Sequence, residues 1–465
     1  MSSINDPRPH FIGVVCVALF LAATGYSQSP SRPAWLDPYR ETAAKLIHES
    51  IRDDFAWRRL AELTDTFGHR LSGSENLERA IAWAEATMKR DGLQNVRTEP
   101  VMVPKWVRGR ESAEILTPPQ HPIAMLGLGG SIGTPAGGIE AEVLSVSSFD
   151  EVRSRAADAR GRIVLFNAPF TTYSDTVTYR TNGARVASQL GALAVLVRAV
   201  GPTGLRTPHT GSVQYGQGIP PIPAASISTE DADRIARLSA AGTRVRVRLT
   251  MEARTEPDVA SANVVGEIRG RERPEEIVLL GGHIDSWDVG TGASDDGVGC
   301  IVTWEAARLM AKLGITPRRT IRIVLWTNEE NGLRGATAYA ARHAGHASNH
   351  VFALESDSGV FEPASLGFSG SAAARGMVRD IGSLLTQLGL SDIVAGGGGA
   401  DIGPIAQAGN APMMAYLGNP TRYFAIHHTP ADTVDRITPQ EVSKAAAAIA
   451  VMTYVIADMP ERLPR

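Results

Sequence analysis

The sequence predicts an α/β fold: a mixed, largely parallel sheet flanked by helices, with an inserted β-rich domain. Within residues 251–465, runs rich in β-branched residues alternate with helical patterns, which is typical of a sheet buried on both faces. Between about 122 and 250 the pattern changes to short apolar runs separated by Gly-, Pro- and Thr-rich loops. A chain of 465 residues is also too long for one core, so two or three domains are expected.

The amino-terminal part, residues 31–121, is predicted to open with helices. From Tyr39 to Gly92, apolar residues recur at helical spacing, interrupted by the segment FGHRLSGS. Ser74 is placed to cap the second helical stretch, and Gly92 is placed to end it. A strand is expected next, at 96–104.

Residues 122–250 form the predicted inserted domain. Strands are expected at 139–146, 161–168, 191–200 and 244–250, with one helix near 231–238. No cluster of ligand-type side chains occurs in this part. We interpret this segment as an insertion because the regular strand–helix alternation of the α/β core begins only after residue 250.

The carboxyl-terminal part, residues 251–465, is predicted to alternate strands with helices. Strands are expected at 262–270, 275–285, 320–330 and 350–359, and helices at 297–314, 332–344 and 375–390. A last helix is predicted to begin at Thr438-Pro439, with Glu441 completing a capping box.

Residues 1–30 have the pattern of a secretory signal peptide. Arg8 and His10 precede the apolar run FIGVVCVALFLAATG, and small or polar residues follow it. The run is shorter than the roughly 20 apolar residues of a bilayer-spanning anchor. We therefore expect cleavage, a secreted or periplasmic protein, and no stable membrane span in the mature chain.

Composition narrows the chemistry further. The only cysteines are Cys16 and Cys300, so cleavage would leave no disulfide partner and no thiolate metal site; Cys300 is expected to be buried in a helix. The 46 basic and 49 acidic residues nearly balance, without a basic block, which gives no electrostatic reason to bind nucleic acid or an anionic membrane. Small neutral or zwitterionic substrates fit better.

Polar side chains gather at the ends of successive predicted strands, where ligands bind in open α/β sheets. The set comprises His283, Asp285, Asp295, Asp296, Glu329, Glu330, Glu355, Asp357 and the late segment HHTPADT at 427–433. Acids this dense would repel one another in a partly desolvated crevice unless cations neutralised them. One catalytic zinc would use three protein ligands and a water, and more ligand-type side chains than that are available. The set therefore fits two metals that share a carboxylate better than it fits one metal.

The motifs GGHIDSWD, ASDDG, NEE, ESD and HHTPADT, in this order, resemble the metal motifs of the zinc aminopeptidase and glutamate carboxypeptidase family of co-catalytic metallopeptidases. The resemblance includes the GHRLSGS segment and covers nearly all of the mature chain. Residues 122–250 resemble the protease-associated domain found in one subgroup. The resemblance implies the zinc-peptidase fold, of the phosphorylase/hydrolase-like type, and two Zn²⁺ ions per chain.

Carried over by position, the resemblance implies a set of metal ligands. Asp295 would bridge the two ions, His283 and Asp357 would complete one, and Glu330 and His428 would complete the other. His428 is preferred to its neighbour because the family's ligand directly precedes a Thr-x-x-Asp-Thr segment, here TPADT.

Catalytic roles are implied in the same way. Glu329 would be the general base, and Asp285 would accept the free N–H of His283 and fix the tautomer of that ring. Some relatives bind the oxyanion with a Tyr where this chain has Asn410, so that donor stays open. Trp287, Tyr416 and Tyr423 are candidates for the pocket lining, although aromatic residues at strand ends are more often packing residues.

The function that the resemblance implies is a secreted or periplasmic exopeptidase that hydrolyses small peptides, and it suggests a homodimer. Aminopeptidase, carboxypeptidase and dipeptidase activities all stay open. A noncatalytic, receptor-like binding protein on the same fold is an alternative. The presence of all the expected metal ligands disfavours it. A single-zinc glutaminyl cyclase is another, but that type does not need His283. His and carboxylate ligands would also accept cobalt or manganese.

Overall fold

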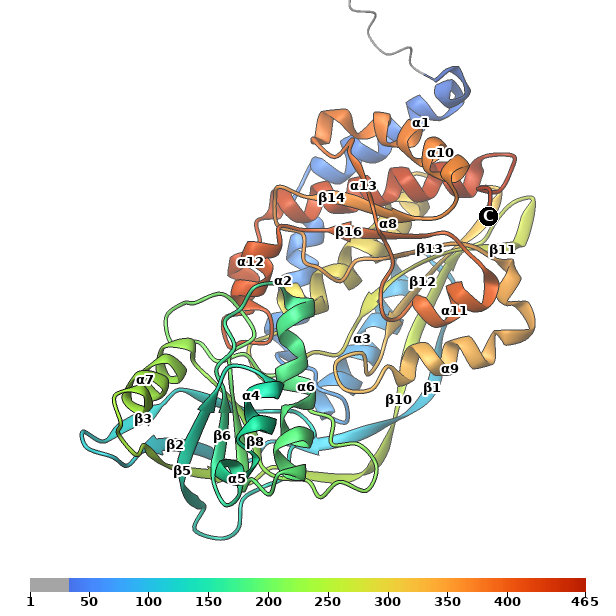
Figure 1. Ribbon diagram of the computed structural model, residues 1–465. Helices are drawn as coiled ribbons and strands as arrows, with labels where there is room; N and C mark the ends of the chain where they lie inside the picture. The colour runs from blue at the N-terminus through green and yellow to red at the C-terminus, as the bar shows by residue number, and fades with distance from the viewer. Residues whose placement is uncertain (1–32) are drawn as a thin grey trace, which may run out of the picture.

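The computed structural model describes residues 33–465, and the predicted signal segment at 1–30 lies outside them. The chain forms two lobes, each built on its own sheet (Figure 1). The long strands β1 (Gln94–Val107) and β10 (Arg254–Ile268) pair with each other and run from one lobe toward the other. Within the described residues, none of the helices has the length and apolarity that crossing a bilayer requires.

The sheet of the larger lobe is mixed, as predicted. Its strands follow the order β1, β10, β12 (Arg319–Trp326), β11 (Arg273–His283), β13 (His350–Glu355), β16 (Met413–Leu417), β14 (Ser365–Ser369) and β15 (Ile393–Ala395). The four central strands, from β12 to β16, are parallel. At one side β1 and β10 pair antiparallel to their neighbours, and at the other β14 is antiparallel to β16 but parallel to β15. The parallel centre places the carboxyl ends of β11, β12 and β13 at one edge.

Helices cover both faces of this sheet, which explains the near-continuous apolar runs in its central strands. In β11, Val278 and Leu280 pack into one core cluster, while Ile277 and Leu279 pack into the other. The first face is covered by α1 (Asp37–Ile51), α2 (Phe55–Phe67), α3 (Glu75–Arg90), α8 (Val298–Lys312), α10 (Ala372–Gly382) and α13 (Pro439–Asp458). The second is covered by α9 (Arg334–Arg342) and α11 (Gly403–Gly409).

Several local predictions are confirmed. The hydroxyl of Ser74 accepts a hydrogen bond from the Leu77 N–H at the start of α3, and Thr438 and Glu441 form the capping box of α13. Cys300 is buried in α8. The helix expected at 375–390 is α10 followed by a 3-10 turn at Ser383–Leu388.

The sheet of the second lobe begins earlier than the predicted boundary at 122. Its order is β3 (His121–Ile123), β2 (Glu111–Ile115), β9 (Arg246–Met251), β5 (Ile139–Val146), β6 (Ile163–Phe166), β7 (Ala194–Arg198), β8 (Ala224–Ile227) and β4 (Met125–Gly127). The second lobe therefore spans 111–251, because β2, expected in the first part, pairs with β9. The four predicted strands correspond to β5, β6, β7 and β9.

The expectation of a single helix in this lobe was wrong. Besides α7 (Thr229–Ala240), which was predicted, the lobe contains α4 (Phe149–Ser154), α5 (Ala156–Ala159) and α6 (Tyr173–Gln189). The sequence of α6 is rich in Thr and other polar residues, so it lacks a clear apolar stripe, although the Thr172 hydroxyl caps it by accepting from the Asp175 N–H. This missed helix borders the larger lobe.

Candidate active site

The predicted clusters meet at the carboxyl edge of the parallel strands. His283 ends β11 opposite Trp326, the last residue of β12, and Gly281 pairs with Glu355 at the end of β13. The loops that follow enclose a cavity of about 570 Å³. Its lining includes Asp295, Glu329, Glu330, Asp357, His427 and His428.

Asp295 lies at the centre of the cluster. His283 Nε2 is 3.3 Å from Asp295 Oδ1, and His428 Nε2 is 3.0 Å from Asp295 Oδ2. On the His283 side of Asp295, Asp357 Oδ1 is 3.5 Å from His283 Nε2. On the His428 side, Glu330 Oε2 is 3.0 Å from His428 Nε2. The five side chains expected to bind metal thus form two groups that share one carboxylate.

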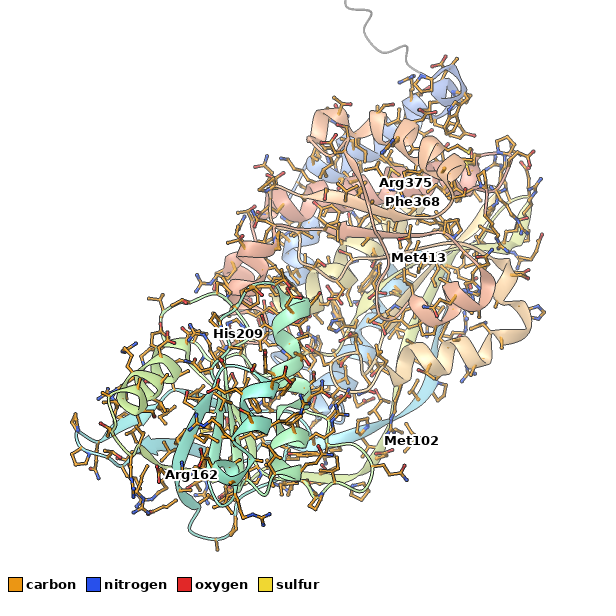
Figure 2. All side chains as sticks on the ribbon, viewed as in Figure 1. Met102, Arg162, His209, Phe368, Arg375 and Met413 are labelled. Atoms are coloured by element: carbon orange, nitrogen blue, oxygen red, sulfur yellow. The ribbon has the colours of Figure 1, made fainter. Side chains whose placement is uncertain are left out.

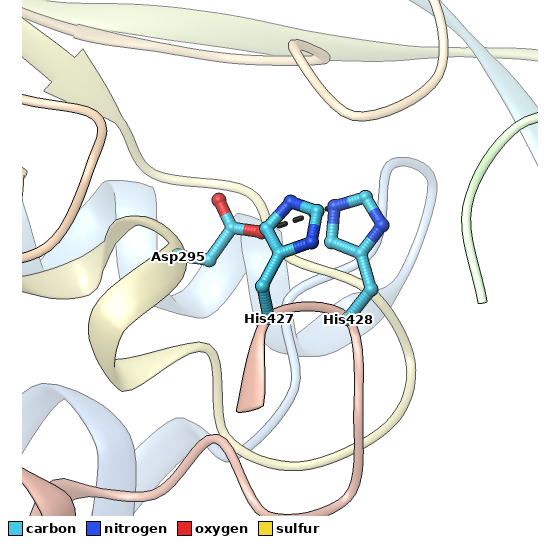
Figure 3. A group of neighbouring side chains, drawn as sticks. All are labelled: Asp295, His427 and His428. Atoms are coloured by element: carbon cyan, nitrogen blue, oxygen red, sulfur yellow. Dashed lines mark ion pairs between the residues drawn. The ribbon is translucent and has the colours of Figure 1, made fainter. Parts of the chain in front are cut away.

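His427 also approaches this carboxylate, since its Nε2 lies 3.4 Å from Asp295 Oδ2 (Figure 3). Its ring stacks on that of His428, with centroids 3.5 Å apart. The other neighbours of the His427 ring are the aromatic rings of Tyr173, Tyr423 and Phe424. His428 is the better placed of the two imidazoles because it faces Glu330 as well as Asp295.

The expected role of Asp285 needs a correction. His283 Nδ1 lies 3.0 Å from the main-chain oxygen of Asp285, whereas the nearer carboxylate oxygen is 3.7 Å away. The carboxylate instead accepts hydrogen bonds from the main-chain N–H groups of Glu329 and Glu330, at 3.1 and 3.3 Å. The peptide carbonyl is therefore placed to orient the His283 ring, and the side chain holds the loop that carries the two glutamates.

Asp432 was not singled out from the sequence, although it is the Asp of the TPADT segment. Its carboxylate accepts hydrogen bonds from the N–H and hydroxyl of Ser294, at 2.7 and 2.8 Å, and from the N–H of Asp295 at 3.1 Å. Burial raises the pKa of Asp432 to about 6, against the effect of these donors. Asp432 thus holds the turn that presents Asp295.

Residues at the site include some with left-handed backbone conformations that non-glycine residues rarely adopt. His428 has φ 60°, and Asn328, which precedes Glu329, has φ 66°. Such residues cost roughly 1–3 kcal/mol each and persist where their surroundings hold them. The Asn328 side chain donates to the Ser72 hydroxyl at 3.0 Å, and the Thr210 N–H donates to the His428 carbonyl at 2.9 Å.

The acids of the site disfavour one another's charge. Burial and the neighbouring Asp295 raise the pKa of Glu330 to about 7, although His428 opposes this. Burial and Asp357 likewise raise the pKa of Glu355 to about 7. Burial, Asp357 and Glu330 also raise the pKa of Glu329 well above its ordinary value. A protein that keeps these acids ionised at neutral pH needs positive charge within the cavity.

The donor set fits divalent cations. Asp295 Oδ2 and Glu330 Oε1 are buried and accept no hydrogen bond from the described residues. Ligand atoms lie within 4.8 Å of one another in three overlapping groups: Asp295, His427 and His428; His283, Asp296 and Asp357; and His283, Asp295 and Glu330. Buried imidazoles and carboxylates with free lone pairs are the ligands that zinc and similar ions take in proteins.

Asp401 is a second acid that the sequence analysis did not single out. It is fully buried, and neither carboxylate oxygen has a partner among the described residues. Burial and the adjacent Glu355 raise the pKa of Asp401 well above its ordinary value. Its own N–H and that of Ile402 donate to Glu355, which fixes this segment against the end of β13.

The second lobe contributes Arg180, from the missed helix α6, to the cavity. Its Nη1 donates to the Thr210 carbonyl at 3.1 Å and lies 3.2 Å from His428 Nδ1, and its Nη2 donates to the Tyr173 hydroxyl at 2.8 Å. None of these partners carries a negative charge, and Nε has no partner among the described residues. Within the described chain, Arg180 is the one Lys or Arg that lines the cavity.

The aromatic candidates divide between the cavity and the cores. Tyr423, in α12 (Pro420–Ile426), lines the cavity. Trp287 packs into the core of the second lobe, and Tyr416 packs into the core of the larger lobe. Asn410 ends α11 and is not among the lining residues of the described cavity.

Comparisons with known proteins show the family and the fold of this chain. Residues 263–453 match the family model for peptidase family M28. Carboxypeptidase Q of Bos taurus is 44% identical over 98% of this chain and 98% of that protein, and the Homo sapiens protein is 48% identical over 88% and 87%. The solved structure of a peptidase M28 precursor from Shewanella amazonensis superposes with a TM-score of 0.88 at 32% identity, covering 92% of this chain and 99% of that one. A zinc aminopeptidase from Bacillus subtilis shares the fold, with a TM-score of 0.66 at 20% identity over 88% of this chain and 96% of its own.

Proposed function

The chain belongs to peptidase family M28 and is a metallopeptidase of the exopeptidase type, and on this basis we propose that it hydrolyses small peptides with two zinc ions and Glu329 as the general base. One observation carries the proposal: His283 and His428 face opposite oxygens of Asp295, each with a further carboxylate beside it. Shared-carboxylate sites of this kind would suit two divalent ions. The zinc aminopeptidase among the solved structures supports zinc as the metal.

Asp295 is assigned as the shared ligand. His283 and Asp357 would hold one ion, and Glu330 and His428 would hold the other. The distances within each group, 3.5 Å and 3.0 Å, support this division. The main-chain carbonyl of Asp285 accepts the Nδ1–H of His283, which leaves Nε2 free to bind metal.

The residues of the cavity have distinct tasks in amide hydrolysis. Bound zinc supplies Lewis acidity, which lowers the pKa of water and polarises a carbonyl group. Glu329, in the cavity wall beside Asp295 and Asp357, takes the proton of the attacking water and later passes it to the departing amine nitrogen. Asp285 keeps Glu329 in place through the hydrogen bond to its main-chain N–H.

Tyr423 is the donor that we assign to the oxyanion of the tetrahedral intermediate. A tyrosine hydroxyl is protonated at neutral pH and can donate one hydrogen bond. Tyr423 lines the cavity, whereas Asn410, at the position where some relatives have Tyr, ends α11 away from it. The ring of Tyr423 packs against that of His427, with centroids 5.1 Å apart, so it lies beside the ligand cluster.

Arg180 indicates which end of the substrate is bound. An arginine has five N–H donors, and the partners of Arg180 leave Nε–H and one N–H of Nη2 free. A cation without a carboxylate partner, in the wall of a cavity that four acids also line, suits the free carboxylate of a peptide. We therefore favour carboxypeptidase or dipeptidase activity over aminopeptidase activity, in line with the carboxypeptidase names of the relatives.

The decisive experiment is a screen of purified, metal-analysed protein on dipeptides with free ends, a blocked amino end or an amidated carboxyl end. Amidation that abolishes cleavage supports a carboxypeptidase or dipeptidase, and blocking the amino end then separates these two. Cleavage of the amidated but not the amino-blocked peptides would indicate an aminopeptidase instead. A protein that hydrolyses none of them would favour the receptor-like alternative, and cyclisation of amino-terminal Gln with one bound zinc would favour the cyclase.

Three further assignments rest on the sequence and its resemblance. The pattern of residues 1–30 supports a signal peptide and a secreted or periplasmic location, which amino-terminal sequencing of the mature protein would test. The second lobe, 111–251, is proposed as a protease-associated domain. A homodimer is proposed from the resemblance, and mass photometry of the purified protein would test it.

A further inference from the structure

Besides α6, which contributes Arg180 and Tyr173, the second lobe contacts the candidate metal site through a loop, residues 209–214. This 209–214 loop starts at His209, which Figure 2 labels in the second lobe where it meets the larger lobe. Its contacts fall on the two residues proposed to bind one of the two ions, Glu330 and His428.

Two hydrogen bonds join the loop to His428. The Thr210 N–H donates to the His428 carbonyl at 2.9 Å, and His428 Nδ1 lies 3.2 Å from the Thr210 carbonyl. The first bond holds a residue with φ 60°. The Thr210 carbonyl can accept the Nδ1–H in the tautomer whose Nε2 lone pair faces Asp295 and Glu330, and Arg180 Nη1 lies equally close to Nδ1, at 3.2 Å. The loop therefore holds the backbone of His428 and places a carbonyl acceptor beside its Nδ1.

A third hydrogen bond joins the loop to Glu330. The Ser212 hydroxyl donates to the main-chain oxygen of Glu330 at 2.7 Å. In the group formed by His283 and Asp357, His283 is held by contacts within the larger lobe. The main-chain carbonyl of Asp285 orients its ring, and its main-chain N–H donates to Asp296 at 3.0 Å. The loop of the second lobe thus supports the Glu330 and His428 half of the site, together with Asp285, whereas these supports of His283 lie in the larger lobe.

The loop is itself anchored firmly in the second lobe. The Gly129 N–H donates to the Gly211 carbonyl and the Val213 N–H donates to the Gly129 carbonyl, at 3.0 and 2.9 Å. The Thr210 hydroxyl donates to the Gly127 carbonyl at 2.8 Å. Gly211 has φ 134°, and a Cβ there would lie 2.3 Å from Cζ of Arg180, so the loop fits only with glycine at this position.

From these contacts we infer that the 209–214 loop is a positioning element for one metal position, the one formed by Glu330 and His428, and that disturbing it weakens this position selectively. The inference rests on the proposed two-zinc site. Partners that orient metal ligands typically change metal affinity by about 10- to 100-fold when they are removed. The position formed by His283 and Asp357 should keep its affinity, because its supports lie in the larger lobe.

The test compares three single variants of the full chain by zinc titration. Ser212→Ala removes one hydroxyl donor, and Gly211→Ala displaces the loop. Ser188→Ala is the matched control, because its hydroxyl also donates to a main-chain oxygen, that of Pro220 at 2.6 Å, on the surface of the second lobe. Each zinc-loaded protein is dialysed against a chelator at a concentration that leaves two ions on the wild type.

We expect Gly211→Ala to retain one zinc per chain, and Ser212→Ala to bind its weaker ion about 10-fold less tightly. Ser188→Ala should retain both, and added zinc should restore the activity of Ser212→Ala. With cobalt in place of zinc, the visible spectrum of Gly211→Ala should lose the contribution of one position.

The outcomes separate this inference from the proposed function. Wild-type protein that binds fewer than two ions would contradict the two-zinc site itself. Wild-type protein with two ions, together with loop variants that lose both ions at once or keep both at wild-type affinity, would overturn the selective role of the loop. Because Ser212→Ala removes only one oxygen atom, it decides the matter even if Gly211→Ala does not fold.

Discussion

His283 and His428 approach opposite oxygens of one carboxylate, that of Asp295, at 3.3 and 3.0 Å. The two imidazoles come from the end of β11 and from the loop after α12, which are far apart in the chain. Had the two rings pointed to different faces of the sheet, a shared metal site would be excluded. Their convergence on Asp295 is the structural basis for the two-zinc proposal.

Replacing the proposed base should separate metal binding from catalysis. Glu329→Gln keeps the shape of the side chain but removes its basicity, so kcat should fall by about 10²- to 10⁴-fold while both zinc ions are retained. Steady-state kinetics and metal analysis of the same preparation would measure this. Glu330→Gln is the contrasting variant and should lose zinc from one position. A near-normal rate for Glu329→Gln would exclude the assigned role.

Tyr423→Phe removes only the hydroxyl proposed to donate to the oxyanion. Loss of one such donor typically lowers kcat by about 10²- to 10³-fold. KM and zinc content should change little, because the donor acts in the transition state and does not bind metal. Tyr416→Phe is the control, since Tyr416 packs in the core and should leave kcat unchanged. Equal effects of the two substitutions would assign the loss to packing.

Arg180→Gln should weaken binding of substrates with a free carboxylate. A hydrogen bond to a charged group contributes about 1.5–3 kcal/mol, which corresponds to roughly a 10- to 100-fold increase in KM. The same substitution should leave the slow cleavage of an amidated dipeptide unchanged. Zinc content must be measured alongside, because Arg180 also donates to the Thr210 carbonyl. A uniform effect on both substrates would argue against carboxylate recognition.

His350 should make the protein less stable in mild acid. Burial, together with Arg322 and His343, lowers the pKa of His350 to about 4, so the ring is neutral in the folded chain. Its unfolded pKa is near 6.5, so its contribution is complete above that pH and is lost as the pH falls from about 6.5 toward about 4.

The matched variant is His350→Gln, which does not titrate and retains a polar side chain near the Tyr339 hydroxyl, the present partner of His350 Nε2 at 2.9 Å. Between pH 7 and pH 5 the free energy of unfolding of the wild type should fall by about 2 kcal/mol more than that of the variant. Urea denaturation at several pH values would measure the difference. Parallel pH profiles would show that His350 is not the group responsible.

Local patterns in the sequence were enough to predict most strands of the larger sheet, the caps at Ser74 and Thr438, and the acids and imidazoles that end the strands. These signals are local because side-chain periodicity and capping depend on neighbouring residues. The parallel arrangement then brings His283, Glu330 and Asp357 to one edge, so their proximity could be expected without coordinates.

Other features depend on contacts between segments far apart in the chain, which leave no periodic or spacing signal in one sequence. The polar helix α6 lacked an apolar stripe, so Arg180 went unnoticed, and no motif links Thr210 or Ser212 to the metal ligands. That the carbonyl of Asp285, rather than its carboxylate, orients His283 is also a matter of three-dimensional geometry. Main-chain groups carry no sequence identity, so the folded chain alone reveals which of them support the site.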